Sequence, residues 1–268
     1  MSAAHWSIAD FCANFARWLL MGISAQPATP LPREPVHAKV PELAGAELAA
    51  VYYGQRMGGD FYDFLRVNSH RVLFALLDMA GRVEENRLFL SAAQRALHTL
   101  GSELFTSEDI NESEAIIHLC IGINRTILQY AGVRTCPAFV GCYNERSGIV
   151  CYVNAGHTPG LVRDANGVVE LPATGLPLGL FSHATADASV VVLYPGAALL
   201  LVSRGVVEAR VKREEMGILR IKEDLQNTTA KHAKDICLAM LDRVKQYMRT
   251  PPTHDDVTAM ALVRTVSS

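Results

Sequence analysis

The chain has 268 residues, of which 50% are hydrophobic and 19% charged, so it can bury a large core and is not a disordered chain. Its 25 basic and 27 acidic residues give a formal net charge of −2. This balance excludes the strong overall field that attracts nucleic acid or an anionic membrane. The six cysteines are scattered, and several stand inside apolar runs, which is typical of a reducing compartment and predicts a cytoplasmic protein. No stretch approaches the ~20 apolar residues of a membrane span.

The N-terminal region predicts an amphipathic helix over residues 6–22. Its apolar side chains recur at a spacing of three or four and share one face: Ile8, Phe11, Phe15, Trp18 and Leu19. Such a face packs on its own domain, or it mediates dimerisation or docks a partner, and both interpretations stay open. Four prolines within residues 26–35 then predict a linker. We therefore divide the chain into an N-terminal helix region (1–25), a linker (26–39) and one domain (40–268).

The domain begins with three predicted strands, and the short connection between the second and third predicts a hairpin. Two amphipathic helices follow, and Asn111 with Glu114 provides a cap for the second. Six more strands, a further helix and a buried final strand complete the pattern. Runs of strands separated by runs of helices predict an antiparallel-rich α+β layered fold. The expected strands are 46–53, 61–67, 71–78, 137–144, 148–154, 160–164, 167–171, 188–194, 198–203 and 257–264, and the expected helices are 85–103, 112–130 and 229–249.

Several catalytic motifs are absent from the sequence. It contains no G-x-S-x-G elbow, H-E-x-x-H motif, P-loop or Rossmann glycine fingerprint. The nine histidines show no spacing typical of metal ligands. His157 and His254 stand in turn-like contexts, where a hydrogen-bonded loop histidine is the favoured interpretation for each.

Acidic residues at the ends of predicted strands are the candidate site. Asp60 follows two glycines, Asp78 ends an apolar strand, and Asp255 and Asp256 precede the last strand. An acid beside a buried strand is held by a rigid scaffold and still reaches solvent. Each of these aspartates alone is typical of a turn or cap. Together they are also compatible with a site for a hard divalent cation such as Mg²⁺ or Mn²⁺, which prefers oxygen ligands, and the spacing alone leaves both interpretations open.

Six segments of residues 40–264 resemble, in order, the motifs of PPM-type (metal-dependent, type 2C) protein phosphatases, closest to the SpoIIE/RsbU branch. They read GGDFYDF, LLDMAG, VNAGHTPG, GLPLGL, LYPGAALLLVSRGVVEAR and HDDVTAMALV. The resemblance implies a four-layer α-β-β-α sandwich, in which helices flank two antiparallel sheets. It also implies two Mn²⁺ or Mg²⁺ ions that activate water, and hydrolysis of phosphoserine or phosphothreonine on regulatory proteins of the anti-anti-sigma type.

The same resemblance implies the metal ligands. Asp60 matches the first metal-site aspartate, and Asp78 matches the metal-bridging aspartate, followed by the backbone carbonyl of Met79. Asp255 matches the C-terminal ligand, and its neighbour Asp256 is the weaker candidate. No catalytic residue separate from these ligands is expected.

One departure from the family pattern concerns a ligand directly. The T-D-G motif, whose aspartate binds metal, reads Ser203, Arg204 and Gly205. Replacing an aspartate with an arginine changes the charge of the site by two units. One unit charge at 4 Å is worth about 4 kcal/mol at an effective dielectric near 20, so we expect weakened metal binding and little activity by the usual mechanism. In addition, Leu77 replaces a glycine, and the following glycine-rich turn reads Gly81, Arg82 and Val83.

Two functions follow from this pattern. In the first, the chain is a pseudophosphatase or weakly active signalling protein that recognises a regulatory protein or phosphopeptide. In the second, it is an active Mn²⁺- or Mg²⁺-dependent serine/threonine phosphatase acting on a phosphorylated regulatory protein. A homodimer formed through the N-terminal helix is a further expectation.

Overall fold

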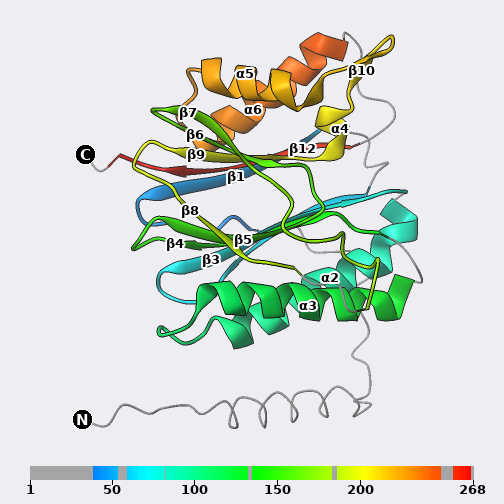
Figure 1. The fold of residues 1–268 in the computed structure, drawn as a ribbon, viewed down its shortest axis with the longest axis vertical. Coiled ribbons are helices and arrows are strands. Elements are labelled where there is room, and N and C mark those ends of the chain that lie inside the picture. Colours follow the sequence, from blue (N-terminus) through cyan, green and yellow to red (C-terminus); the bar gives the residue numbers. More distant parts are fainter. Residues whose placement is uncertain are drawn as a thin grey trace. The chain divides into compact units, whose positions relative to one another are not determined.

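Two five-stranded antiparallel sheets form the centre of the computed structural model (Figure 1). The model describes residues 39–53, 59–81, 83–131, 135–182, 186–248 and 256–266. The expected helix at 6–22, His254 and Asp255 lie outside the described residues, as does almost all of the expected linker. No helix in the described ranges is long and apolar enough to span a bilayer.

Each sheet combines strands that are distant in sequence. The first sheet has the order β1 (Ala46–Tyr53), β12 (Val257–Arg264), β9 (Ala198–Val202), β6 (Gly160–Asp164) and β7 (Gly167–Leu171). The second has the order β2 (Gly59–Arg66), β3 (Arg71–Met79), β4 (Ala138–Asn144), β5 (Ile149–Ala155) and β8 (Ser189–Val192). The predicted hairpin between the second and third strands is confirmed by the antiparallel pairing of β2 with β3.

Helices cover the outer face of each sheet (Figure 1). The helices α2 (Val83–Leu104) and α3 (Glu112–Ala131) bury apolar residues against the second sheet. On the first sheet, α5 (Gly217–Asn227) and α6 (Ala233–Met248) do the same. A third apolar cluster fills the space between the sheets. This arrangement confirms the expected four-layer sandwich.

The strand β3 shows how the sequence produces these layers. All nine of its residues are buried, and successive side chains of a strand point to opposite faces. Leu73 and Leu77 therefore contact the helices α2 and α3, whereas Phe74 and Leu76 face the other sheet. A strand that is covered on both faces appears in the sequence as a continuous apolar run.

The predicted elements occur close to their expected bounds, and the differences have physical causes. The Asn111 side chain accepts the backbone N–H groups of Ser113 and Glu114 at 3.1 and 3.3 Å, which confirms the cap of α3. The sequence prediction missed α5, whose buried residues are only Ile221 and Leu225. It also missed the one-turn helix α4 (Arg204–Val207) and the hairpin strands β10 (Arg210–Val211) and β11 (Glu214–Glu215), which are too short to show a period.

Candidate functional site

The candidate acids converge where the inner faces of the two sheets end. Even-numbered residues of β3 face the inter-sheet core, and Asp78 continues that series. The same alternation applies to β12, where Met260 faces the core and Thr258 and Asp256 precede it on the same side. Asp60 lies at the start of β2, opposite Asp78. Strand alternation therefore brings together residues almost 200 positions apart.

Asp60 and Asp78 are direct cross-strand partners on β2 and β3, a placement in which like charges destabilise a sheet. Asp60 is compensated by Thr258, whose hydroxyl donates a hydrogen bond of 2.6 Å to Asp60 Oδ2. Burial, followed by the negative charge of Asp78, nevertheless holds the pKa of Asp60 well above its usual range. Binding of a proton or of a cation would relieve this repulsion.

Arg204 supplies positive charge to this pair. Its backbone N–H donates to Asp78 Oδ2 at 2.7 Å, and its guanidinium nitrogen Nη2 lies 3.7 Å from Asp78 Oδ1. The side chain of Arg204 is 39% exposed, whereas that of Asp78 is 4% exposed. The residue that replaces the expected aspartate is therefore turned toward the expected bridging carboxylate.

Asp256 adds a third acid, held by side chains that the sequence prediction did not identify. The Tyr52 hydroxyl donates to Asp256 Oδ1 at 2.7 Å. Ser203 and Thr258 join the neighbouring strands: the Ser203 N–H donates to the Thr258 carbonyl, and the Thr258 N–H donates to Ser203 Oγ, both at 3.0 Å. Thr258 could have been found from strand alternation, because it lies two residues after Asp256. Nothing in the local sequence indicates Tyr52.

The Met79 carbonyl, an expected metal ligand, is packed against Gly59. A Cβ atom added to Gly59 would lie 2.5 Å from this oxygen. The residue before Asp60 must therefore lack a side chain for β2 and β3 to pair here. The next carbonyl, that of Ala80, accepts a hydrogen bond of 3.2 Å from the buried Asn86 side chain, which ties the end of β3 to α2.

His157 lies close enough to Asp78 for that carboxylate to act on its charge. The Thr158 hydroxyl donates to the Val202 carbonyl, so it can only accept from His157 Nδ1, 3.1 Å away. Nδ1 therefore carries the proton and Nε2 a lone pair. Nε2 is buried with no hydrogen-bond partner among the described residues, and burial lowers the pKa of the imidazole. The sequence prediction of a hydrogen-bonded loop histidine thus holds for one ring nitrogen only.

The described residues do not fit a centre of two divalent ions. Among them, no group of three or more His, Cys, Asp or Glu side chains lies close enough to hold a metal. Asp78 already has a cationic partner in Arg204, and Asp60 and Asp256 accept hydroxyl donors. Asp255, the remaining expected ligand, lies outside the described part of the chain.

Comparison with known proteins finds relatives that align with most of the chain. The chain is 23% identical over 252 residues to protein IcfG of Synechocystis sp. and spans 39% of that protein's length. The RsbU and RsbW domains of Rv1364c from Mycobacterium tuberculosis match 87% of the chain and 64% of their own, with a TM-score of 0.67 and 24% identity. The PP2C phosphatase domain of Bacillus subtilis SpoIIE, with a fragment of its regulatory domain, matches 83% of the chain and 64% of its own, with a TM-score of 0.68 and 18% identity.

More distant structures of the same fold hold metal. The catalytic domain of the serine/threonine phosphatase PstP, with two manganese ions, and RsbX, with magnesium, match with TM-scores of 0.57 and 0.58 at 13% and 14% identity. The family model of stage II sporulation protein E (SpoIIE) matches residues 68–265, which include β3, the Arg204 turn and β12. The chain therefore belongs to the SpoIIE family and has a PP2C-type phosphatase-like domain.

Proposed function

We propose that this chain is a signalling protein that binds a phosphorylated regulatory partner protein and hydrolyses its phosphate slowly or not at all. The observation that carries this proposal is the position of Arg204, whose backbone N–H and guanidinium both face Asp78. A guanidinium keeps its charge at all physiological pH values. It can therefore take the charge-balancing role of a metal ion, but it cannot produce the hydroxide nucleophile that such an ion supplies.

The charge of the site supports the same conclusion. Three aspartates with one arginine carry −2, whereas four aspartates would carry −4 and balance two divalent ions. Each 1.4 kcal/mol of lost interaction weakens ion binding tenfold. A change of two unit charges close to the ion therefore lowers affinity by orders of magnitude. We infer that the site holds at most one weakly bound Mn²⁺ or Mg²⁺, the ions named with PstP and RsbX.

The relatives indicate the kind of partner. The matched Mycobacterium tuberculosis structure joins an RsbU domain to an RsbW domain, and another match is described as a bacterial stressosome component. A regulatory protein carrying phosphoserine or phosphothreonine is thus the expected partner of this chain. Dimerisation through residues 6–22 and a cytoplasmic location remain predictions.

The alternative function, an active phosphatase, is supported by the convergence of Asp60, Asp78 and Asp256. Calorimetric titration with Mn²⁺ and hydrolysis of p-nitrophenyl phosphate separate the two functions. We expect the wild type to show no ion site or one weak site and negligible hydrolysis. Arg204→Asp should bind Mn²⁺ at least 100-fold more tightly and gain hydrolysis.

A matched control is Arg146→Asp, which makes the same charge change on an exposed side chain. Arg146 lies in the turn between β4 and β5, near the Arg71 end of β3. Seven residues of strand, or about 23 Å, separate Arg71 from Asp78. This variant should behave as the wild type does. Strong wild-type hydrolysis that Asp78→Ala abolishes would reject the proposal in favour of the active enzyme.

A further inference from the structure

The hairpin of β10 and β11 presents two adjacent cations at its tip. Val211 pairs with Glu214, so Lys212 and Arg213 form the two-residue turn between the strands. Both side chains are exposed. Within the described part of the chain, neither forms an ion pair or a hydrogen bond. The neighbouring carboxylates of Glu214 and Glu215 are paired with Arg220 and Arg210, so the tip keeps two exposed cations that are open to a partner.

The backbone at the tip is unfavourable for lysine. Lys212 has a φ of +58°, in the left-handed region that glycine and asparagine adopt most easily. Among the described non-glycine residues only Lys212 has a positive φ, so the turn needs this conformation at its first central position, where glycine is preferred. The chain instead places two cations there and accepts a strained backbone, which is a recurrent feature of functional turns.

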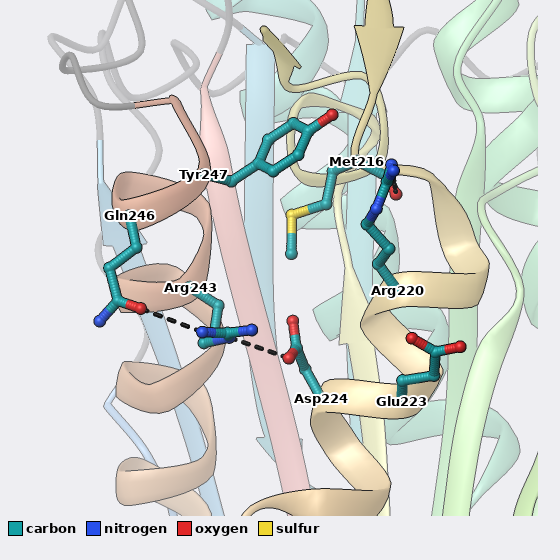
Figure 2. A pocket seen from close by; sticks show the side chains of 7 residues that line it. All are labelled: Met216, Arg220, Glu223, Asp224, Arg243, Gln246 and Tyr247. Atoms are coloured by element: carbon teal, nitrogen blue, oxygen red, sulfur yellow. Dashed lines mark hydrogen bonds and ion pairs between the residues drawn. The ribbon is translucent and has the colours of Figure 1, made fainter.

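The hairpin is anchored to the helices beneath it, so the two cations are held in place. The Arg210 guanidinium pairs with the Glu215 carboxylate at its base. Arg220 on α5 donates to the Glu215 carbonyl at 2.6 Å, and Tyr247 on α6 donates to the Glu214 carbonyl at 3.1 Å. Arg220 also lies over the Tyr247 ring, 5.4 Å from its centroid (Figure 2).

The pocket between α5 and α6 in Figure 2 belongs to this anchor. It has a volume of about 390 Å³, and two of its charged side chains, Arg243 and Asp224, pair with each other. Arg243 donates to Asp224 at 2.8 Å and to Gln246 at 3.1 Å. The pocket is therefore part of the scaffold that supports the turn.

The turn lies on the same connection as Arg204. Residues 204–220 contain five basic and three acidic side chains, so this segment is positive in a protein of net charge −2. Eight residues separate Arg204 from Lys212, which limits the distance between them to about 28 Å. A standard protein interface of about 800 Å² per partner is wide enough to cover both residues.

We propose that Lys212 and Arg213 form a docking contact for an acidic segment of the partner protein, next to the phosphorylated residue that Arg204 receives. The phosphorylated residue near Arg204 follows from the proposed function. The acidic segment follows from charge complementarity with Lys212 and Arg213. Complementary charge fixes orientation and raises the association rate. Because exposed charges are screened by salt, the docking contribution should fall as ionic strength rises.

The test uses the full chain and three fluorescein-labelled peptides. The first has a phosphoserine with an acidic flank, the second a phosphoserine with a neutral Ser/Gly flank, and the third an unphosphorylated serine with the acidic flank. Fluorescence anisotropy gives each Kd at low and at physiological salt. Exposed ion pairs are individually weak, but reversing two of them should weaken binding of the first peptide about tenfold.

Three variants carry the comparison. Lys212→Glu with Arg213→Glu should lose affinity for the two acidic peptides and keep that for the neutral-flank peptide. Lys212→Gly with Arg213→Ser removes both charges and places glycine at the positive φ, so a similar though smaller loss there separates lost charge from misfolding. Lys231→Glu with Lys234→Glu is the matched control. Lys231 precedes α6 and Lys234 lies in its first turn, about 20 Å along that helix from Tyr247.

The outcomes separate this inference from the proposed function. Unchanged affinity of both turn variants for the acidic peptides overturns the docking contact. If Arg204→Ala leaves binding of the phosphorylated peptides intact, Arg204 does not bind the phosphate group and the proposed function is wrong on this point. Even then, weaker binding of the unphosphorylated acidic peptide by the turn variants would support the docking contact at Lys212 and Arg213.

Discussion

Two aspartates, three residues apart on β2, have opposite surroundings. Asp63 is fully buried, and its carboxylate accepts the Phe64 N–H at 2.8 Å, the Gln94 amide at 3.0 Å and His98 Nε2 at 2.7 Å. Asp60 lies opposite a second acid, and Thr258 on the other sheet donates to it. An odd separation places the two carboxylates on opposite faces of the strand.

The difference shows what distinguishes a structural acid from a candidate functional one. Asp63 is surrounded only by donors, two of them from α2, and so it ties that helix to the sheet. Asp60 and Asp78 repel each other, and their compensation comes from Thr258 and Arg204, which lie far away in the sequence. Burial alone thus says little about function, whereas repulsion between neighbouring carboxylates marks a candidate functional site.

The largest effect should come from removing the structural acid. Asp63→Ala leaves three buried or half-buried donors without an acceptor, and we expect a loss of about 3 kcal/mol in the free energy of unfolding. Urea denaturation monitored by circular dichroism measures this loss. The matched variant Asp60→Ala also removes an acceptor, but it relieves the repulsion with Asp78. It should therefore cost about 1 kcal/mol or less, and equal losses at both positions would contradict the distinction.

A smaller loss should follow from a methyl group at the junction of β2 and β3. In Gly59→Ala, the new Cβ would overlap the Met79 carbonyl and the Asn86 amide, so we expect a loss of about 2 kcal/mol from strand displacement. Gly45→Ala is the control. Its φ is +69° and no atom lies within 4 Å of the added Cβ. The only expected loss is therefore the cost of placing alanine in the left-handed conformation, about 1 kcal/mol in the free energy of unfolding. Equal losses would show that close approach at Gly59 has no special role.

The sequence could predict those parts of the molecule whose pattern is local. Long apolar runs and amphipathic periods located most strands and the three long helices, and acids next to strands pointed to Asp60 and Asp78. The resemblance revealed Arg204 as a substitution, but the direction of its side chain depends on the path from β9 into α4. Thr258 follows from strand alternation two residues after Asp256, whereas Tyr52 reaches the site through the pairing of β1 with β12, which sequence spacing does not encode.

The smallest effect concerns pH and tests the structural acid through its histidine. The hydrogen bond to Asp63 raises the pKa of His98 above its usual value of 6.5, because the carboxylate favours the charged imidazole. A raised folded-state pKa gives stability that is complete below the unfolded-state pKa, near pH 6.5, and is lost as pH rises through the folded-state value.

His98→Gln keeps a donor for Asp63 but does not titrate. The wild type should therefore exceed this variant in free energy of unfolding by more at pH 5.5 than at pH 9, when both are measured by urea denaturation at fixed salt. Because the His98 side chain is 44% exposed, solvent screening keeps this difference small. In the Asp63→Ala background the difference should no longer depend on pH, since the partner that raises the pKa is gone. A pH-independent difference with Asp63 present would mean that the imidazole and the carboxylate are not coupled, and that Asp63 is held by Phe64 and Gln94 alone.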